Sequence, residues 1–437
     1  MRLLGIGLHG IKIFCAFMEL SRPIFHSFYD KLLSTIFNAT DLVCKTSMEK
    51  AATVEKEVSA RENTSGLVVS GDGSWRKRGF SSLFGLVSLI GWNTEKVIDI
   101  IIKSSYCKAC EYTAEYSEWL QSHENNCEAN HMGSAGKMEV DAVIEMFQRS
   151  ESLYEIKYGS YIGDGDSKTF ASILKSEPYE NFSVQKKECL DHVQKRMGTR
   201  LRNLKKKVPG LGGKGKLTNK LIDELSIYYG LAIRRNHDSI EKMKNDIWAT
   251  LYHKISTNEK PQHDKCPVGE NSWCLWQKSK ASNTLHNFSH KTALPDTVFN
   301  AIKPIYDELS NDDLLNRCLG GFTQNSNESF NATVWSMAPK FRSSGKTVLD
   351  IAGNLAVCTF NDGISSIMNV MKALDMTVGT NCYNFCVAAD KLRIHLSDRL
   401  LSEAAKEARI ALKSARKEEE AMNINMEGQL YGPGIAD

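Results

Sequence analysis

The sequence predicts an α/β protein in which a mixed sheet is interrupted by a mainly helical insertion and preceded by a helical N-terminal region. Two observations predict this class. β-rich and helical runs alternate over residues 66–208, and residues 209–325 then change to long helical runs. With 437 residues, 42% of them hydrophobic, the chain is long enough for two or three domains, or for one enlarged core with an insertion.

The first sixty residues have helical spacing, with apolar positions recurring through FHSFYDKLLSTIFNATDLV. The apolar opening LLGIGLHGIKIFCAFMEL is interrupted by His9, Lys12 and Glu19 and has no small-residue cleavage site, so we expect neither a secretory signal nor a membrane span. Twelve cysteines without a signal peptide favour a reducing compartment, where thiols bind metal or stay free.

From Gly66 the pattern changes to strands. LVVSGD reads as a first strand ending on Asp72, and SLFGLVSLIGW and KVIDIIIKSSY follow around a hairpin signal at residues 93–95. After a helical run in MEVDAVIEMFQRSESLYEI, KYGSYIGDGDS is a short strand that ends in carboxylates. A helix in TFASILKSE, a strand in SVQKKECL and a basic helix from Asp191 complete the order. Three antiparallel strands that lead into a mixed sheet in this order describe the RNase H-like fold.

We therefore expect five regions. They are a helical N-terminal region (1–65), the first part of the RNase H-like core (66–208) with a Cys/His-rich insertion (107–131), a helical insertion domain (209–325), the last part of the core (326–396), and a charged C-terminal helix and tail (397–437).

Asp72 stands between two glycines in GDG, and this setting allows two interpretations. Asp-Gly is a common tight-turn pair. Alternatively, the carboxylate lies at the lip of a sheet, where bare backbone lets a large molecule approach.

The strand order favours the second interpretation. Asp72 ends the first strand and Asp164 ends the fourth, which lies beside the first in such a sheet, so the two carboxylates could bridge a pair of divalent cations. Glu328, in TQNSNESFNATVW, would supply a third carboxylate from a later helix. Asp166 is a rival to Asp164, which we prefer because it directly follows the apolar strand.

Two groups of cysteines and histidines have metal-ligand character. Cys107-x2-Cys110-x12-His123-x3-Cys127 has the spacing of a zinc finger, with His131 as a spare ligand, and unpaired buried thiols are the alternative.

The second group is looser. It would combine Cys189 and His192 with three ligands from the insertion, His263, Cys266 and Cys274, if the insertion folds back.

The segment from Lys186 to Lys216 holds eleven Lys/Arg and only two acids. This density predicts a face that contacts DNA phosphates or a nuclear-localisation patch, with a solvated helix face as the alternative. The candidate DNA-binding residues are Arg196, Arg200, Arg202, Lys205, Lys206, Lys207, Lys214 and Lys216.

Several stretches resemble the Mutator-like transposases of animal genomes: GDGSWRKRGFSSLFG, YCKAC, YIGDGDS, ECLDHVQKRMGTRLR, LSIYYGLAIR, HKISTNEKPQHDKCP and CLGGFTQNSNESFN. The resemblance implies a DDE/D-type RNase H-like core interrupted by a helical insertion, with Asp72, Asp164 and Glu328 as the catalytic triad. It also implies a Cys-x-x-His signature, matched by Cys189 and His192.

The expected protein is a nuclear DNA transposase that uses Mg²⁺ or Mn²⁺, cuts at transposon ends and transfers the freed 3′-hydroxyl to target DNA. We expect structural zinc, a homo-oligomer and no membrane association. The alternative is a domesticated or decayed descendant that binds DNA without cutting it. All three acids are present, which favours cleavage, whereas neither terminus shows a separate end-recognition domain.

Overall fold

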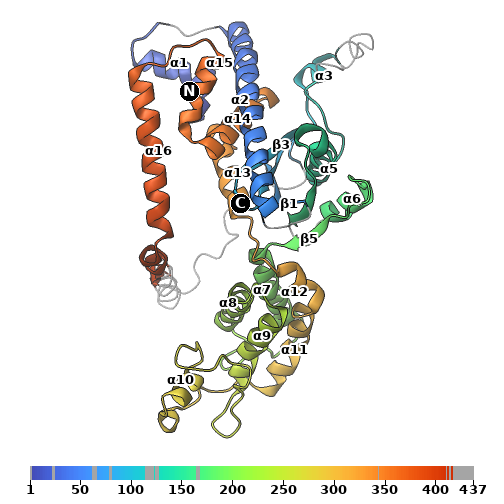
Figure 1. Cartoon of the computed structure of the whole chain (residues 1–437), viewed down its shortest axis with the longest axis vertical. Helices are drawn as coiled ribbons and strands as arrows, with labels where there is room; N and C mark the ends of the chain where they lie inside the picture. The colour runs from blue at the N-terminus through green and yellow to red at the C-terminus, as the bar shows by residue number, and fades with distance from the viewer. Residues whose placement is uncertain are drawn as a thin grey trace. The chain divides into compact units, whose positions relative to one another are not determined.

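The computed structural model describes residues 2–21, 25–61, 66–77, 81–113, 123, 127–163, 168–342, 344–409, 411–412 and 415–416 (Figure 1). The chain forms two compact units, which divide between Asn361 and Asp362.

The first unit is built on a five-stranded mixed sheet in the order β3-β2-β1-β4-β5. β1 is antiparallel to β2, which is antiparallel to β3, whereas β4 is parallel to β1 and β5 is parallel to β4. The strands are β1 (Leu67–Trp75), β2 (Phe84–Gly91), β3 (Val97–Ser104), β4 (Tyr158–Gly163) and β5 (Gln185–Glu188).

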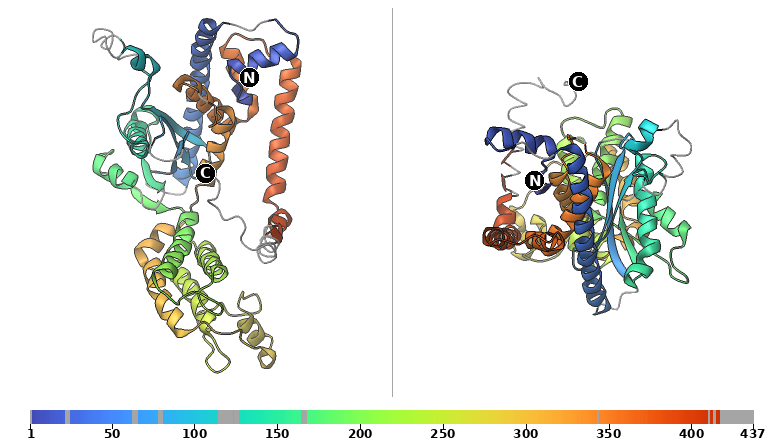
Figure 2. Two further views of the ribbon diagram at one scale, coloured as in Figure 1. Left: turned by 180° about the vertical axis from the view of Figure 1, so that it is seen from behind. Right: turned by 90° about the horizontal axis from the view of Figure 1, so that it is seen from above.

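Helices cover both faces of this sheet. On one face, Val143 and Phe147 of α5 (Ala135–Tyr154) share a buried apolar cluster with Val69, Val87 and other strand residues. The opposite face carries α13 (Asn325–Met337), which packs on β1 and β2, and α14 (Lys346–Asp362). Figure 2 shows the strands edge-on in its right panel, with the green α5 and the orange α13 and α14 on opposite sides.

The GDG motif lies inside β1, because the strand continues to Trp75. The expectation that Asp72 ends the first strand is therefore wrong, and so is the tight-turn interpretation. The flanking glycines have a packing reason: a Cβ at Gly71 would lie 2.5 Å from the Tyr161 ring, and one at Gly73 would lie 2.9 Å from Glu139 Oε2. Side chains alternate along a strand, so the side chain of Asp72 points to the sheet face opposite the one where Tyr161 and Glu139 pack against the glycines.

The remaining helices before the insertion follow the predicted order. The long α2 contacts β3 and α5. These elements are η1 (Arg2–Leu4), α1 (Leu8–Phe17), α2 (His26–Arg61), α3 (Lys108–Thr113), α6 (Lys168–Ser176) and α7 (Leu190–Lys207).

Residues 209–325, the expected insertion, are mainly helical, and α7 packs with their helices. Val193, Met197 and Leu201 of α7 are buried in one cluster with residues of α8, α9, α11 and α12. Apolar residues recur every three or four positions on each helix, which gives each helix one apolar face that packs into this cluster. The helices are α8 (Asn219–Arg235), α9 (Ile240–Ile255), α10 (Leu275–Ala281), η3 (Leu285–Asn287), α11 (Asp296–Leu309) and α12 (Asp312–Cys318).

The second unit contains η4 (Ile364–Ser366), α15 (Ile367–Ala373) and α16 (Thr380–Leu401). Asp390 of α16 accepts hydrogen bonds from the backbone N–H groups of Ile364 and Ser365 and thereby ties α16 to η4. Across the described helices of the whole chain, none is both long and apolar enough to cross a membrane.

Candidate active site

Side chains along one face of α13 hydrogen-bond to successive positions of β1. The donors are spaced three or four residues apart, which places them on one side of a helix. The bonds run from Gln324 Nε2 to Gly71 O (2.8 Å), from Asn327 Nδ2 to Ser70 O (3.1 Å), from Asn331 Nδ2 to Asp72 Oδ2 (2.7 Å) and from Trp335 Nε1 to Ser74 Oγ (2.8 Å). These contacts fix α13 along the strand that carries Asp72.

Asp72 is the electrostatic centre of this arrangement. The pKa of its carboxyl is raised to about 6, chiefly by burial and in smaller part by the negative charge of Glu328. The positive charge of His192 and the hydrogen bond from Asn331 lower the pKa without cancelling these effects. Residues from β1, α13 and α7 therefore meet at one place, and the exposed Glu328 leaves that place open to solvent.

The start of α7 is tied to the segment that leads into α13, because the backbone N–H of Leu190 donates to the carbonyl of Phe322 at 2.9 Å. Cys189, which precedes the helix, is buried with Ile162 and Phe322 in a small cluster, and burial raises the pKa of its thiol. The Cys-x-x-His pair is thus divided in role: Cys189 packs in the core, whereas the charge of His192 acts on Asp72.

The second predicted acid follows β4. This strand ends at Gly163 and pairs in parallel with β1, with Ile162 opposite Ser70. Asp164 and its rival Asp166 lie outside the described residues.

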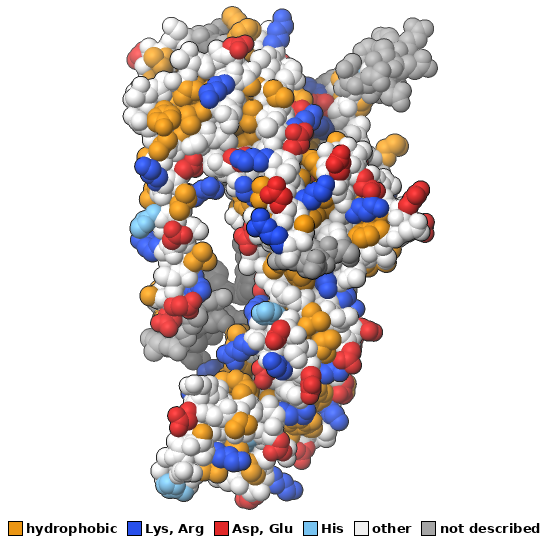
Figure 3. All heavy atoms as spheres, viewed as in Figure 1, with side chains coloured by type: hydrophobic (Ala, Val, Ile, Leu, Met, Phe, Trp, Pro, Cys, Tyr) orange, Lys and Arg blue, Asp and Glu red, His pale blue; other side chains and the backbone are white. Residues whose placement is uncertain are grey.

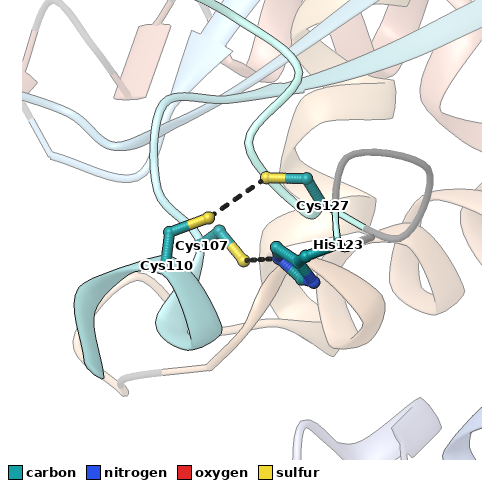
Figure 4. A group of neighbouring side chains, drawn as sticks. All are labelled: Cys107, Cys110, His123 and Cys127. Carbon is teal, nitrogen blue, oxygen red and sulfur yellow. Dashed lines mark hydrogen bonds between the residues drawn. The ribbon is translucent and has the colours of Figure 1, made fainter. Parts of the chain in front are cut away.

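The predicted zinc-finger residues do form a cluster. Cys107 Sγ lies 3.2 Å from His123 Nε2, Cys110 Sγ lies 3.5 Å from Cys127 Sγ, and the four ligand atoms all lie within 4.8 Å of one another. Figure 4 shows the four side chains pointing toward one another beside the short helix α3. This cluster could bind a metal ion such as zinc.

The electrostatics of one of these thiols, Cys107, agree with a ligand role. Burial opposes ionisation of Cys107, but backbone hydrogen bonds and the contact with His123 outweigh it and lower the pKa of the thiol to about 6. His131 is not a spare ligand, since its Nδ1 lies 3.3 Å from a carboxylate oxygen of Asp141 and its Nε2 lies 3.3 Å from the carbonyl of Ser134.

A second cluster forms within the insertion, with a membership that differs from the prediction. His263, Cys266 and Cys274 come together as expected, but the fourth ligand is His253 of α9. Cys189 and His192 are not part of this cluster, so the proposed shared site is wrong. All four residues of this cluster lie between positions 253 and 274, within the insertion.

A model of the Mutator-like transposase family matches residues 1–274, which is more than half of the 437 residues. The chain belongs to the Mutator-like transposase family. The match contains Asp72, Asp164 and both metal clusters, whereas Glu328 lies beyond it. No curated protein and no solved structure matches the chain.

The arginines predicted to bind DNA in this transposase-family chain are engaged within the protein. Arg196 pairs with the buried Glu188 at 2.6 Å, and Glu188 also pairs with Arg317 at 3.1 Å. Arg200 pairs with Glu308, and Arg202 pairs with Asp223 at 2.6 Å. Arg200 and Arg202 therefore join α7 to α11 and α8, whereas Arg196 joins α7 to β5.

The exposed cations of the basic segment are mainly lysines, together with Arg202. Lys206, Lys207, Lys214 and Lys216 are exposed, and Lys216 Nζ also donates to the carbonyl of Gly210 at 2.8 Å. Lys205 is half-buried, and its Nζ donates to Asn219 at 2.9 Å. On the face drawn in Figure 3, Lys and Arg side chains are interspersed with Asp and Glu over the insertion helices, in the lower part of the view.

Two residues of these sites were not predicted from sequence. Asn331 had a usable signal, because Gln324, Asn327, Asn331 and Trp335 repeat at helical spacing around Glu328. His253 lies in the last turn of an ordinary amphipathic helix, ten positions before His263, so nothing local marks it as a ligand.

Proposed function

We propose that the chain is a DNA transposase that cleaves phosphodiester bonds at transposon ends and transfers the freed 3′-hydroxyl to target DNA. Asp72, Asp164 and Glu328 would hold the catalytic metal. The observation that carries the proposal is the 2.7 Å bond from Asn331 of α13 to Asp72 of β1, which places Glu328, one helical turn before Asn331, on the helix beside Asp72 in a chain of the Mutator-like transposase family.

The sheet supports an RNase H-like assignment of residues 66–208 and 326–361, with residues 209–325 as the insertion domain. Residues 362–396, which were expected in this core, belong to the second compact unit. The strand order β3-β2-β1-β4-β5, with the first three strands antiparallel and the last two parallel to β1, is the order expected for that fold. We favour Asp164 over Asp166 because Asp164 directly follows the apolar strand in the sequence.

The residues at this place suit a hard divalent cation. Carboxylate oxygens are the ligands that Mg²⁺ and Mn²⁺ take in such sites. The raised pKa of Asp72 reflects burial first and the negative charge of Glu328 second, and a cation there would favour the charged form of both acids. Asn331 Oδ1 is buried without a hydrogen-bond partner among the described residues, which leaves an acceptor for a metal-bound water.

Bound metal would activate the attacking oxygen and stabilise the leaving one. The protein's own residues hold the carboxylates in place. Asn331 orients Asp72 through its 2.7 Å bond, and His192 favours the charged form of Asp72 that a metal needs.

For DNA contact we propose Lys206, Lys207 and Lys214, which are exposed and stand beside a glycine-rich loop. Arg196, Arg200 and Arg202 brace the helices instead. Action on chromosomal DNA implies a nuclear protein, and cutting two transposon ends together implies a homo-oligomer. The cluster of Cys107, Cys110, His123 and Cys127 would hold structural zinc.

The proposal is tested by nicking of supercoiled plasmid that carries the element's ends, with Mg²⁺ or Mn²⁺. The wild-type protein should nick only with metal, and Glu328→Gln should lower the rate at least 100-fold, because it removes one charged ligand. The matched control is Glu241→Gln, since Glu241 is also an exposed glutamate in the first turn of a helix. This control should nick at the wild-type rate.

Normal nicking by Glu328→Gln would refute the assignment of Glu328. Metal-independent DNA binding without any nicking by the wild-type protein would instead support a decayed, DNA-binding descendant.

A further inference from the structure

We infer that the insertion contains a structural Zn²⁺ site formed by His253, His263, Cys266 and Cys274, separate from both the carboxylate site and the finger at residues 107–127. The four residues come from three places: His253 from the end of α9, His263 and Cys266 from the loop that follows, and Cys274 from the residue before α10.

The distances fit tetrahedral zinc. Zn–N bonds of about 2.05 Å and Zn–S bonds of about 2.3 Å place tetrahedral ligand atoms about 3.3 Å apart for N–N and about 3.5 Å apart for N–S. His253 Nδ1 and His263 Nδ1 lie 3.2 Å apart, and Cys274 Sγ lies 3.4 Å from His263 Nδ1. Cys266 Sγ lies 3.7 Å from His263 Nδ1, and Cys274 Sγ lies 3.8 Å from His253 Nδ1.

Burial makes a metal-free cluster costly. His263, Cys266 and Cys274 are 1%, 3% and 0% exposed, so their polar atoms have lost water. Without metal, only the weak S–H groups of the cysteines and an imidazole N–H can donate hydrogen bonds within this group of four ligand atoms. One cation in their midst satisfies all four together.

A chain of hydrogen bonds fixes the tautomer that a zinc ligand needs. If His263 binds metal through Nδ1, its proton is on Nε2, which lies 2.9 Å from His290 Nε2. His290 then accepts at Nε2 and donates from Nδ1 to Asn258 Oδ1 at 2.8 Å. Ligating histidines commonly donate their second N–H in this way. His290 and Asn258 are thus positioning residues for the site.

The segment that the site would order has little else to hold it. Over residues 256–294 the only helices are α10 and η3. The apolar cluster there consists of Ala249, Cys266 and Cys274, with Trp273 and Trp276 partly buried against it. Zinc would therefore connect this segment to the end of α9, and its removal should open the segment while the main helical core stays folded.

Zinc counting tests the inference. Soluble protein purified without chelator should carry two zinc ions per chain, and Cys266→Ser should carry one. The control Cys318→Ser changes a buried cysteine outside both clusters and should keep two. One zinc in the wild-type protein, lost with Cys107→Ser and kept with Cys266→Ser, would overturn the inference.

If Cys266→Ser proves insoluble, the wild-type protein still decides the matter. Replacing zinc by Co²⁺ should load two ions with tetrahedral d–d bands, and loading of one ion would contradict the inference. His290→Ala should release zinc to a chelator 10- to 100-fold more readily, as expected for loss of a ligand's hydrogen-bond partner. His286→Ala, in the same segment but outside the cluster, should release it at the wild-type rate.

Discussion

Asn331 Nδ2 donates a 2.7 Å hydrogen bond to Asp72 Oδ2, and this bond joins α13 to the middle of β1. Asn331 lies one helical turn beyond Glu328 on α13. The helix that supplies one proposed metal ligand therefore also orients another, so small shifts of α13 would disturb both carboxylates.

We expect Asn331→Ala to lower the nicking rate about 10- to 100-fold, because partners that orient metal ligands typically contribute this much. Asn331→Asp should lower it further, since a third acid beside Asp72 and Glu328 adds repulsion. Rates are measured at saturating Mn²⁺. The control is Asn325→Ala, an exposed position on the same helix that should cut normally; equal losses at both positions would mean a general effect on α13.

The raised pKa of Asp72 predicts that this carboxylate costs stability when no metal is bound. Its pKa of about 6 exceeds the ordinary 3.8, so the folded protein holds the proton more tightly than the unfolded chain does. In EDTA at pH 7.5, Asp72→Asn should therefore stabilise the protein by about 1–3 kcal/mol while abolishing nicking.

The stabilisation by Asp72→Asn should decrease as the pH falls. The stabilisation by Asp72→Asn is fully present above pH 6 and fades as the pH falls toward 4, because the wild-type carboxyl is then protonated too. Thermal or denaturant unfolding at several pH values measures it. Destabilisation at pH 7.5 would show that the charged form of Asp72 is favoured without metal.

The exposed lysines of the basic segment should bind DNA through phosphates. Changing Lys206, Lys207 and Lys214 to Gln should weaken binding to all sequences about equally and reduce the log–log salt slope by up to about 3 units. Changing three exposed lysines elsewhere, Lys175, Lys372 and Lys391, should leave the slope unchanged. An unaltered slope in the first variant would make the segment a solvated face.

Arg196 should behave differently from these lysines. Arg196→Ala removes a partner of Glu188, which is 1% exposed, and should cost about 1–3 kcal/mol of stability. Folded Arg196→Ala should keep the wild-type salt slope. A lower salt slope of DNA binding with unchanged stability would instead show that Arg196 contacts DNA.

The finger at residues 107–127 should be structural. Cys107→Ser should lose one zinc ion and some thermal stability, because the short insertion has little apolar surface to order it. Nicking per folded molecule should stay at the wild-type level, since these ligands are not part of the carboxylate site. Cys15→Ser, outside both clusters, is the control. A loss of nicking in folded Cys107→Ser would contradict this, because it would show that the finger takes part in DNA cleavage.

The sequence predicted the sheet well because its strands carry local signals. Apolar runs such as LVVSGD and FGLVSLIG identify strands, and the order of strands and helices limits how they pair. The extent of β1 beyond Asp72 was missed, since Gly71 and Gly73 suggest a turn unless Tyr161 is known to pack against them.

Long-range pairing explains most of the remaining errors. Arg196 of α7 and Arg317 of α12 converge on Glu188 of β5, and Arg200 of α7 pairs with Glu308 of α11. His253 could not be recognised as a candidate ligand from the sequence, because only the fold brings the end of α9 beside Cys274. Side-chain type was visible in the sequence, but the partner in space was not.

Mn²⁺ binding tests most directly whether Asp72, Asp164 and Glu328 form one metal site. Electron paramagnetic resonance of free Mn²⁺ would measure it in zinc-loaded protein, alongside nicking by each single variant and the triple variant. We predict that Mg²⁺ competes for the site, that Asp72→Asn, Asp164→Asn and Glu328→Gln each abolish tight binding and nicking, and that the triple variant is no worse than each single. Asp166→Asn should be milder than Asp164→Asn. Wild-type Mn²⁺ binding and nicking by the Asp72 or Glu328 variant would contradict the shared site.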